Sequence, residues 1–137
     1  MKNSVAKLDH VNFTVSNLNE TAEWYKNIFN FELVEEGVSQ TGHKWGILKS
    51  GDTMLAITEY PEKTWYFGDK FHQTYHFGLR LKNKNEWEEK IKDYDLETFY
   101  SSPITYPHST SWYVKDPTGN EIEVAIWANN EVMFARK

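Results

Sequence analysis

The stretch Tyr75-His76-Phe77-Gly78-Leu79-Arg80-Leu81 alternates between two kinds of side chain, which predicts a β-strand with His76, Gly78 and Arg80 on one face. A similar stretch lies about sixty-six residues earlier, Leu8-Asp9-His10-Val11-Asn12-Phe13-Thr14-Val15. Each has a histidine near its start, and each is followed by a helical pattern. This repetition indicates an internal duplication, and its long period favours a two-fold pseudo-symmetric domain over a repeat array.

Each half is predicted to run strand, helix, strand, strand, strand. In the first half, Asn17 is a helix N-cap with Glu20 three residues later, and an apolar stripe follows as far as Asn30. In the second half, either Asn83 or Asn85 caps the helix. The strands are expected at residues 8–15, 31–38, 43–49 and 53–59, then at 74–82, 96–100, 110–115 and 121–127, with a loop over 101–108.

The predicted fold class is therefore α+β, with two tandem βαβββ modules forming a curved, cup-shaped mixed sheet. We expect one domain over residues 1–137, with module one at about 7–59 and module two at about 74–127. A connector at 60–73 and a tail at 128–137 complete the chain. The connector is rich in aromatic residues, including Trp65, and we expect it to pack over a cavity or against a second subunit.

Composition narrows the classes of function. The chain has 137 residues, 39% of them hydrophobic, which is enough for a substantial core. The net charge of −5 argues against binding to nucleic acid or to an anionic membrane. There is no cysteine, so disulfide and thiolate chemistry are excluded. With no apolar leader or membrane-spanning run in the sequence, we expect a soluble cytoplasmic protein.

Three stretches resemble the vicinal oxygen chelate superfamily, which includes lactoylglutathione lyase, bleomycin- and fosfomycin-resistance proteins and extradiol dioxygenases. They are Leu8-Asp9-His10-Val11 with the helix that ends Trp24-Tyr25-Lys26-Asn27-Ile28-Phe29-Asn30-Phe31-Glu32-Leu33, then His76-Phe77-Gly78-Leu79, and finally Tyr113-Val114-Lys115-Asp116-Pro117-Thr118-Gly119-Asn120-Glu121-Ile122-Glu123-Val124. The resemblance covers roughly residues 7–127. The last stretch is fairly specific to the superfamily, but not to one activity within it.

The resemblance implies a divalent metal held by His10, His76 and Glu123. The lyases and epimerases of the family add a fourth ligand, whose position falls here on Leu55 or Ala56, and neither side chain can bind a metal. Glu59 lies nearby, and whether it joins the site stays open. The resemblance also implies a homodimer.

Two imidazoles and one carboxylate form a facial triad that leaves coordination positions open for two adjacent substrate oxygens. Fe, Zn, Mn and Ni all suit such a site. Each residue also has a simpler explanation. His10 and His76 can be hydrogen-bonded histidines at strand starts, and Glu123 can lie on a hydrated face.

Three further residues are candidates for substrate binding: Asn12, Thr14 and Arg80. Arg80 can bind an anionic group, or it can pair with a structural carboxylate. Asn12 and Thr14 can orient a ligand, or they can hydrogen-bond to neighbouring strands. His108 is either a mobile acid/base or a plain surface histidine. Trp45, Trp65 and Trp112 either wall an apolar pocket or belong to ordinary packing.

We therefore expect a metal-dependent glyoxalase- or dioxygenase-like enzyme that acts on a small oxygenated compound through vicinal oxygens. The alternative is a non-catalytic, bleomycin-resistance-like protein that sequesters a drug in a cleft. A metal-free relative with another role is a third possibility. A small molecule is the expected partner in the first two cases, without nucleic acid or membrane.

Overall fold

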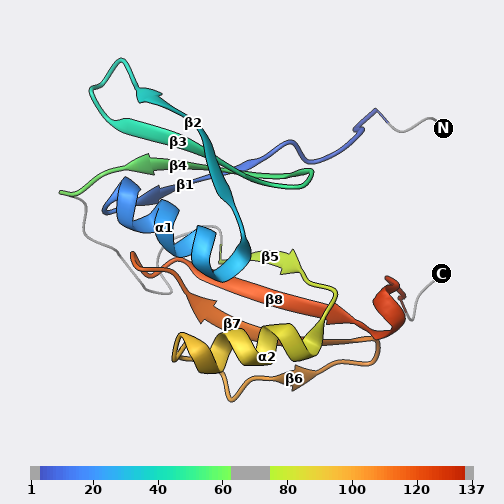
Figure 1. Cartoon of the computed structure of the whole chain (residues 1–137). Helices are drawn as coiled ribbons and strands as arrows, with labels where there is room; N and C mark the ends of the chain where they lie inside the picture. Colours follow the sequence, from blue (N-terminus) through green and yellow to red (C-terminus); the bar gives the residue numbers. More distant parts are fainter. Residues whose placement is uncertain (1–3, 63–74, 135–137) are drawn as a thin grey trace. The chain divides into compact units, whose positions relative to one another are not determined.

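The structure is a computed structural model that describes residues 4–62 and 75–134 (Figure 1). The chain divides into two compact units, residues 1–66 and 67–137. Each unit has its own four-stranded sheet and one α-helix. The connector aromatics predicted to cover a cavity or a second subunit, including Trp65, lie outside the described residues.

The first unit contains β1 (Val11–Val15), α1 (Leu18–Phe29), β2 (Glu32–Val38), β3 (Lys44–Ser50) and β4 (Thr53–Glu59). Its strands lie in the order β1-β4-β3-β2. The pairing of β1 with β4 is parallel, and the other two pairings are antiparallel. The sheet is therefore mixed, with the first and last strands of the module side by side.

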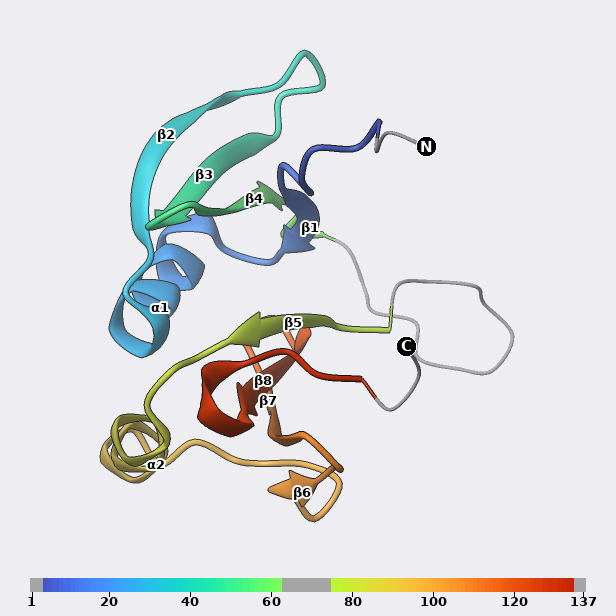
Figure 2. The ribbon, with the colours of Figure 1, turned by 90° about the vertical axis from the view of Figure 1, so that its right-hand side faces the viewer.

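The second unit repeats this arrangement with β5 (Phe77–Arg80), α2 (Lys84–Asp93), β6 (Ile104–Thr105), β7 (Ser109–Lys115) and β8 (Glu121–Trp127), followed by a short 3₁₀ helix, Ala128–Asn130. The strand order is β5-β8-β7-β6, and β5 pairs with β8 in parallel (Figure 1). Figure 2 shows the chain running from β5 into α2. The predicted α+β class and the two βαβββ modules are confirmed. The cup that we expect the modules to form stays a prediction.

The N-cap residues of both helices are asparagines that the sequence analysis predicted. The Asn17 side chain accepts a hydrogen bond from the Glu20 N–H at 2.8 Å, and Asn30 ends α1 in the left-handed conformation. Asn83, rather than Asn85, caps α2 by accepting the Glu86 N–H at 3.0 Å. Neither these helices nor any other in the described part of the chain is long and apolar enough to cross a membrane.

The prediction of a short strand at residues 96–100 is wrong. These residues form a loop and a turn, and the corresponding strand is β6, inside the region predicted as loop. Tyr100 and Ser101 both have positive φ angles, 60° and 57°, which a strand does not tolerate. The first strand of each module is also shorter than predicted, so that His10 and His76 lie immediately before β1 and β5.

Each sheet has one apolar face. In the first unit α1 packs on β2, β3 and β4, and Tyr25, Leu48 and Ile57 are wholly buried. In the second unit, the strand register places Leu79, Trp112 and Val124 on one buried face, and Trp87 is the buried residue of α2. Trp112 is therefore a core residue. The opposite face of the second sheet carries polar side chains.

Replacement of Leu48 by alanine should lower the free energy of unfolding by about 2–5 kcal/mol, because Leu48 is fully buried and its loss leaves a cavity. Urea denaturation followed by circular dichroism measures this change. The neighbouring exposed substitution Lys49→Ala should change the value by less than about 0.5 kcal/mol. Equal unfolding midpoints for the two variants would contradict this assignment of the core.

Candidate metal-binding site

The polar face of the second sheet brings together residues from three strands. Gly78 of β5 is paired with Glu123 of β8, and Glu123 is paired with Tyr113 of β7. Paired residues in neighbouring strands point to the same face, so the Glu123 carboxylate lies beside Gly78 and the Tyr113 phenol. The nearest carboxylate oxygen is 3.8 Å from the point where a side chain on Gly78 would begin. Glycine thus leaves the space over β5 open next to Glu123.

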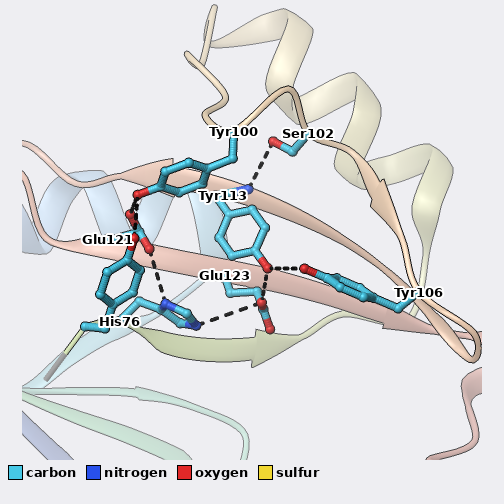
Figure 3. A network of polar contacts seen from close by, with 8 residues as sticks. His76, Tyr100, Ser102, Tyr106, Tyr113, Glu121 and Glu123 are labelled. Carbon is cyan, nitrogen blue, oxygen red and sulfur yellow. Dashed lines mark hydrogen bonds and ion pairs between the residues drawn. The ribbon is translucent and has the colours of Figure 1, made fainter.

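His76 lies between two carboxylates (Figure 3). Its Nε2 is 3.9 Å from Glu123 Oε1, and its Nδ1 is 3.2 Å from Glu121 Oε2. The side chains of His76 and Glu123 are 29% and 25% exposed to solvent, whereas that of Glu121 is only 9% exposed. The Nε2 side of the imidazole therefore meets a partly open carboxylate, and the Nδ1 side meets a buried one.

Phenol groups hold both carboxylates in place. The Tyr113 hydroxyl donates to Glu123 Oε1 at 2.5 Å and is 2.9 Å from the Tyr106 hydroxyl (Figure 3). The Tyr100 hydroxyl donates to the other oxygen of Glu121. Burial and the hydrogen bond to Glu123 raise the pKa of Tyr113 above its ordinary value. The hydrogen bond to Glu121 does the same for the pKa of Tyr100. Both phenols therefore stay protonated at neutral pH.

The loop that carries Tyr100 is fastened to β7. The Ser102 hydroxyl accepts the backbone N–H of Tyr113 at 3.3 Å and donates to the Phe99 carbonyl at 2.7 Å. The Phe99 N–H in turn donates to the Tyr113 carbonyl at 2.9 Å. These bonds bring Tyr100 next to Tyr113, with ring centroids 5.3 Å apart.

The donor atoms of this face fit a divalent cation. An imidazole nitrogen and a carboxylate oxygen each bind such ions at about 2.0–2.2 Å, so two ligands of one ion lie no more than about 4.3 Å apart. The 3.9 Å between His76 Nε2 and Glu123 Oε1 is within that limit. Among the described residues of this unit, no three His, Asp or Glu side chains form a group that could hold a metal by themselves.

His10 belongs to the first unit, and its role as the third ligand stays a prediction. Its Nδ1 is 2.7 Å from Asp9 Oδ2, and its side chain is 45% exposed. The Asn12 side chain accepts a hydrogen bond from the Thr58 hydroxyl at 3.1 Å, so Asn12 does bond to a neighbouring strand. Thr14 is paired with Thr58 in the same sheet.

A model of the Glyoxalase/Bleomycin resistance protein/Dioxygenase superfamily matches residues 7–124. The chain belongs to this superfamily. The match spans both modules and includes the three residues of the predicted metal triad.

The sequence identity between this chain and individual members of the superfamily is low. A metallothiol transferase, FosB, from Staphylococcus epidermidis is 24% identical over 122 residues, which cover 88% of this chain and 81% of that protein. A glyoxylase/bleomycin resistance protein/dioxygenase domain from Frankia has a TM-score of 0.77 at 16% identity, covering 93% and 96% of the two chains. The fosfomycin resistance protein FosX from Listeria monocytogenes has a TM-score of 0.68 at 23% identity, covering 90% and 95%. The structural likenesses show the fold.

The strand register identifies the position in the first unit that is equivalent to Glu123 in the second. Glu123 lies opposite Gly78, two residues after His76. The equivalent position in the first unit lies opposite Asn12, two residues after His10, and is occupied by Ala56. Ala56 rather than Leu55 is therefore the equivalent of Glu123, and a methyl group cannot bind a metal; that this is the fourth ligand position of the superfamily's lyases and epimerases stays a prediction.

Glu59 has a different task in the first unit. It is paired with Val15, on the face that carries α1, and its Oε2 accepts the Leu18 N–H at 2.8 Å. A carboxylate at the first turn of a helix satisfies a free N–H group and stabilises the helix dipole. Asn12 and Ala56 lie on the opposite face of the sheet, so Glu59 does not point in their direction.

Two other predicted candidates, Arg80 and His108, make few contacts that indicate a role. Arg80 is exposed and lies two residues beyond Gly78 on the same face of β5. It forms no ion pair with a carboxylate in the described part of the chain. His108 is half-buried, and its backbone carbonyl accepts the Ala128 N–H at 3.0 Å. The structure gives its imidazole no role.

The sequence analysis missed the residues that surround the ligands. Glu121 precedes Glu123 by two residues on one strand, and this spacing signals that both side chains share a face. Tyr113 can be found by pairing β7 with β8 across the turn at 116–120. Tyr100 carries no such signal, because it reaches Glu121 from an irregular loop.

The raised pKa of Tyr113 predicts how stability changes at alkaline pH. Below about pH 10 the phenol is protonated in both the folded and the unfolded chain, and its contribution to stability is fully present. As the pH rises further, the unfolded chain loses this proton first, so the free energy of unfolding falls. Urea denaturation at a series of pH values should therefore show a shallower alkaline fall in Tyr113→Phe than in the wild type. The exposed control Tyr94→Phe should follow the wild type, and identical slopes for all three proteins would refute the prediction.

Proposed function

We propose that this chain is a metal-dependent enzyme acting on a small oxygenated compound that binds through two adjacent oxygen atoms. The observation that carries the proposal is the 3.9 Å separation of His76 Nε2 and Glu123 Oε1 on the open polar face of the second sheet. The comparisons support it, because one relative is named a metallothiol transferase and one FosX structure is described as a complex with Mn(II) and sulfate.

In this proposal His10, His76 and Glu123 would hold the divalent cation, and Ala56 in the fourth position leaves three protein ligands. A site with three protein ligands keeps positions open for substrate. Once bound, the cation would supply Lewis acidity to the substrate's oxygen atoms. Fe, Zn, Mn and Ni all suit the donor set, and the relatives make Mn(II) the first ion to test.

The other residues of the face would bind and orient the substrate. The Tyr113 hydroxyl holds Glu123 Oε1, which directs the remaining carboxylate lone pairs into the site. In the metal-free chain the raised pKa of Tyr113 keeps the phenol a hydrogen-bond donor to Glu123. Arg80 is exposed on the same face and has no carboxylate partner in the described residues, which suits contact with an anionic substrate group. Asn12 and Thr14 would act from the first unit.

Metal analysis tests this assignment. The full chain, purified without chelators and reconstituted with Mn(II), should hold about one ion per chain by elemental analysis. His10→Ala, His76→Ala and Glu123→Ala should each remove most of this metal, because each deletes a ligand. His43→Ala is the matched control, since the nitrogens of that ring contact Thr41 and Glu62 instead.

The outcomes separate the two expected functions. Loss of metal in the three variants but not in the control supports the enzyme. A wild-type chain that takes up no metal after reconstitution with Mn, Fe, Zn or Ni would refute it. The chain would then fit a drug-sequestering protein, which needs no metal ligands.

A bidentate oxygen ligand tests the open coordination positions. Acetohydroxamate, which binds metals through two adjacent oxygens, should bind to the Mn(II)-loaded chain in isothermal titration calorimetry. The metal-free chain and the Glu123→Ala variant should give no heat of binding, because the ligand would attach to the metal. Equal binding with and without Mn(II) would argue against substrate chelation.

A further inference from the structure

Two buried polar atoms on the second sheet, His76 Nδ1 and Glu121 Oε2, have no hydrogen bond of good geometry within the described residues. They lie 3.2 Å from each other. Buried nitrogen and oxygen atoms nearly always have a partner, because burying them unpaired is costly. Each of these atoms is therefore the natural partner of the other, and a small rotation of either side chain completes the bond.

A second hydrogen bond orients the Glu121 side chain. Its other carboxylate oxygen accepts a hydrogen bond from Tyr100, so that Oε2 is the oxygen directed at His76 (Figure 3). The Glu121 side chain is only 9% exposed, so water competes little for this oxygen. The hydrogen bond from Tyr100 and the burial of Glu121 thus restrict the orientation of this carboxylate.

We propose that Glu121 is a positioning residue that sets the tautomer of His76. By accepting the Nδ1–H, it leaves the lone pair on Nε2, the nitrogen that faces Glu123. Only an unprotonated imidazole nitrogen binds a metal, and the proton position is set by the hydrogen bond that the other nitrogen makes. The consequence for the metal rests on the proposed function, whereas the tautomer itself does not.

The first unit carries an exposed version of the same arrangement. His10 Nδ1 is 2.7 Å from Asp9 Oδ2, which likewise favours a free Nε2. The Asp9 side chain is 77% exposed, so water can replace it. We expect the tautomer of His10 to depend on Asp9 much less than that of His76 depends on Glu121.

Long-range ¹H–¹⁵N nuclear magnetic resonance of the metal-free full chain reads the tautomer directly. At about pH 9, His76 should show the Nδ1–H tautomer. Its signals are assigned with His76→Gln. Glu121→Ala should shift the population toward Nε2–H, whereas Glu121→Gln, which keeps an acceptor oxygen, should preserve most of the wild-type pattern. Tyr94→Phe and Asp9→Ala should leave His76 unchanged.

Mn(II) affinity then tests what the tautomer does. Glu121→Ala should weaken binding by about 10- to 100-fold, and Glu121→Gln by less. Circular dichroism of the metal-free variants identifies any variant that fails to fold. If Glu121→Ala is such a variant, the test rests on Glu121→Gln and Tyr100→Phe. Both should lower the Nδ1–H population of His76 only in part, because both keep an acceptor oxygen at position 121.

Three results would overturn the proposal: an Nε2–H or doubly protonated His76 in the wild type, an unchanged tautomer in a folded Glu121→Ala, or a changed tautomer with wild-type Mn(II) affinity. Failure of the wild type to bind any metal would refute the proposed function instead, while leaving the tautomer measurement intact.

Discussion

The parallel pairing of β5 with β8 is the constraint on which the candidate site depends. These strands are separated in sequence by α2, β6 and β7, yet their register sets Gly78 against Glu123. Because His76 lies two residues before Gly78 and Glu121 two before Glu123, one register places an imidazole between two carboxylates. A shift by a single residue would turn Glu121 and Glu123 toward the apolar face, where Ile122 and Val124 now lie.

The two units share this backbone arrangement and use it differently. In the first unit, the positions equivalent to Glu121, Glu123 and Tyr113 are occupied by Met54, Ala56 and Ile47. Only the histidine before the first strand is common to both. Among the described residues, the hydrogen-bonded network of carboxylates and phenols is therefore present in the second unit and absent from the first.

The phenols give the acidic pair its rigidity. Tyr113 and Tyr100 each donate to one carboxylate, and the raised pKa of each phenol keeps its proton in place. Two carboxylates close to one imidazole would otherwise be free to turn toward water. Hydrogen bonds from fixed donors hold them in position before any ligand arrives, which reduces the ordering needed on binding.

The sequence by itself determined the duplication, the order of the elements, the two helix caps and the membership of the superfamily. These features depend on local patterns, namely the alternation of strand residues, the apolar stripe of α1 and the asparagines at its ends. Glu123 and His76 could be chosen as candidate ligands for the same reason, since each lies on or beside a strand with a recognisable motif. The prediction of a strand at 96–100 was wrong because no local sequence pattern signals the left-handed conformation of Tyr100 and Ser101.

Only the tertiary structure decided which residues surround those ligands. Strand register, set by pairing and packing across the sheet, identified Ala56 as the equivalent of Glu123 and directed Glu59 to the N-terminus of α1. The fastened loop brought Tyr100 to Glu121 across a gap of twenty-one residues in sequence. Contacts of this kind depend on the path of the whole chain, because the hydrogen bonds that create them join residues with no local relationship.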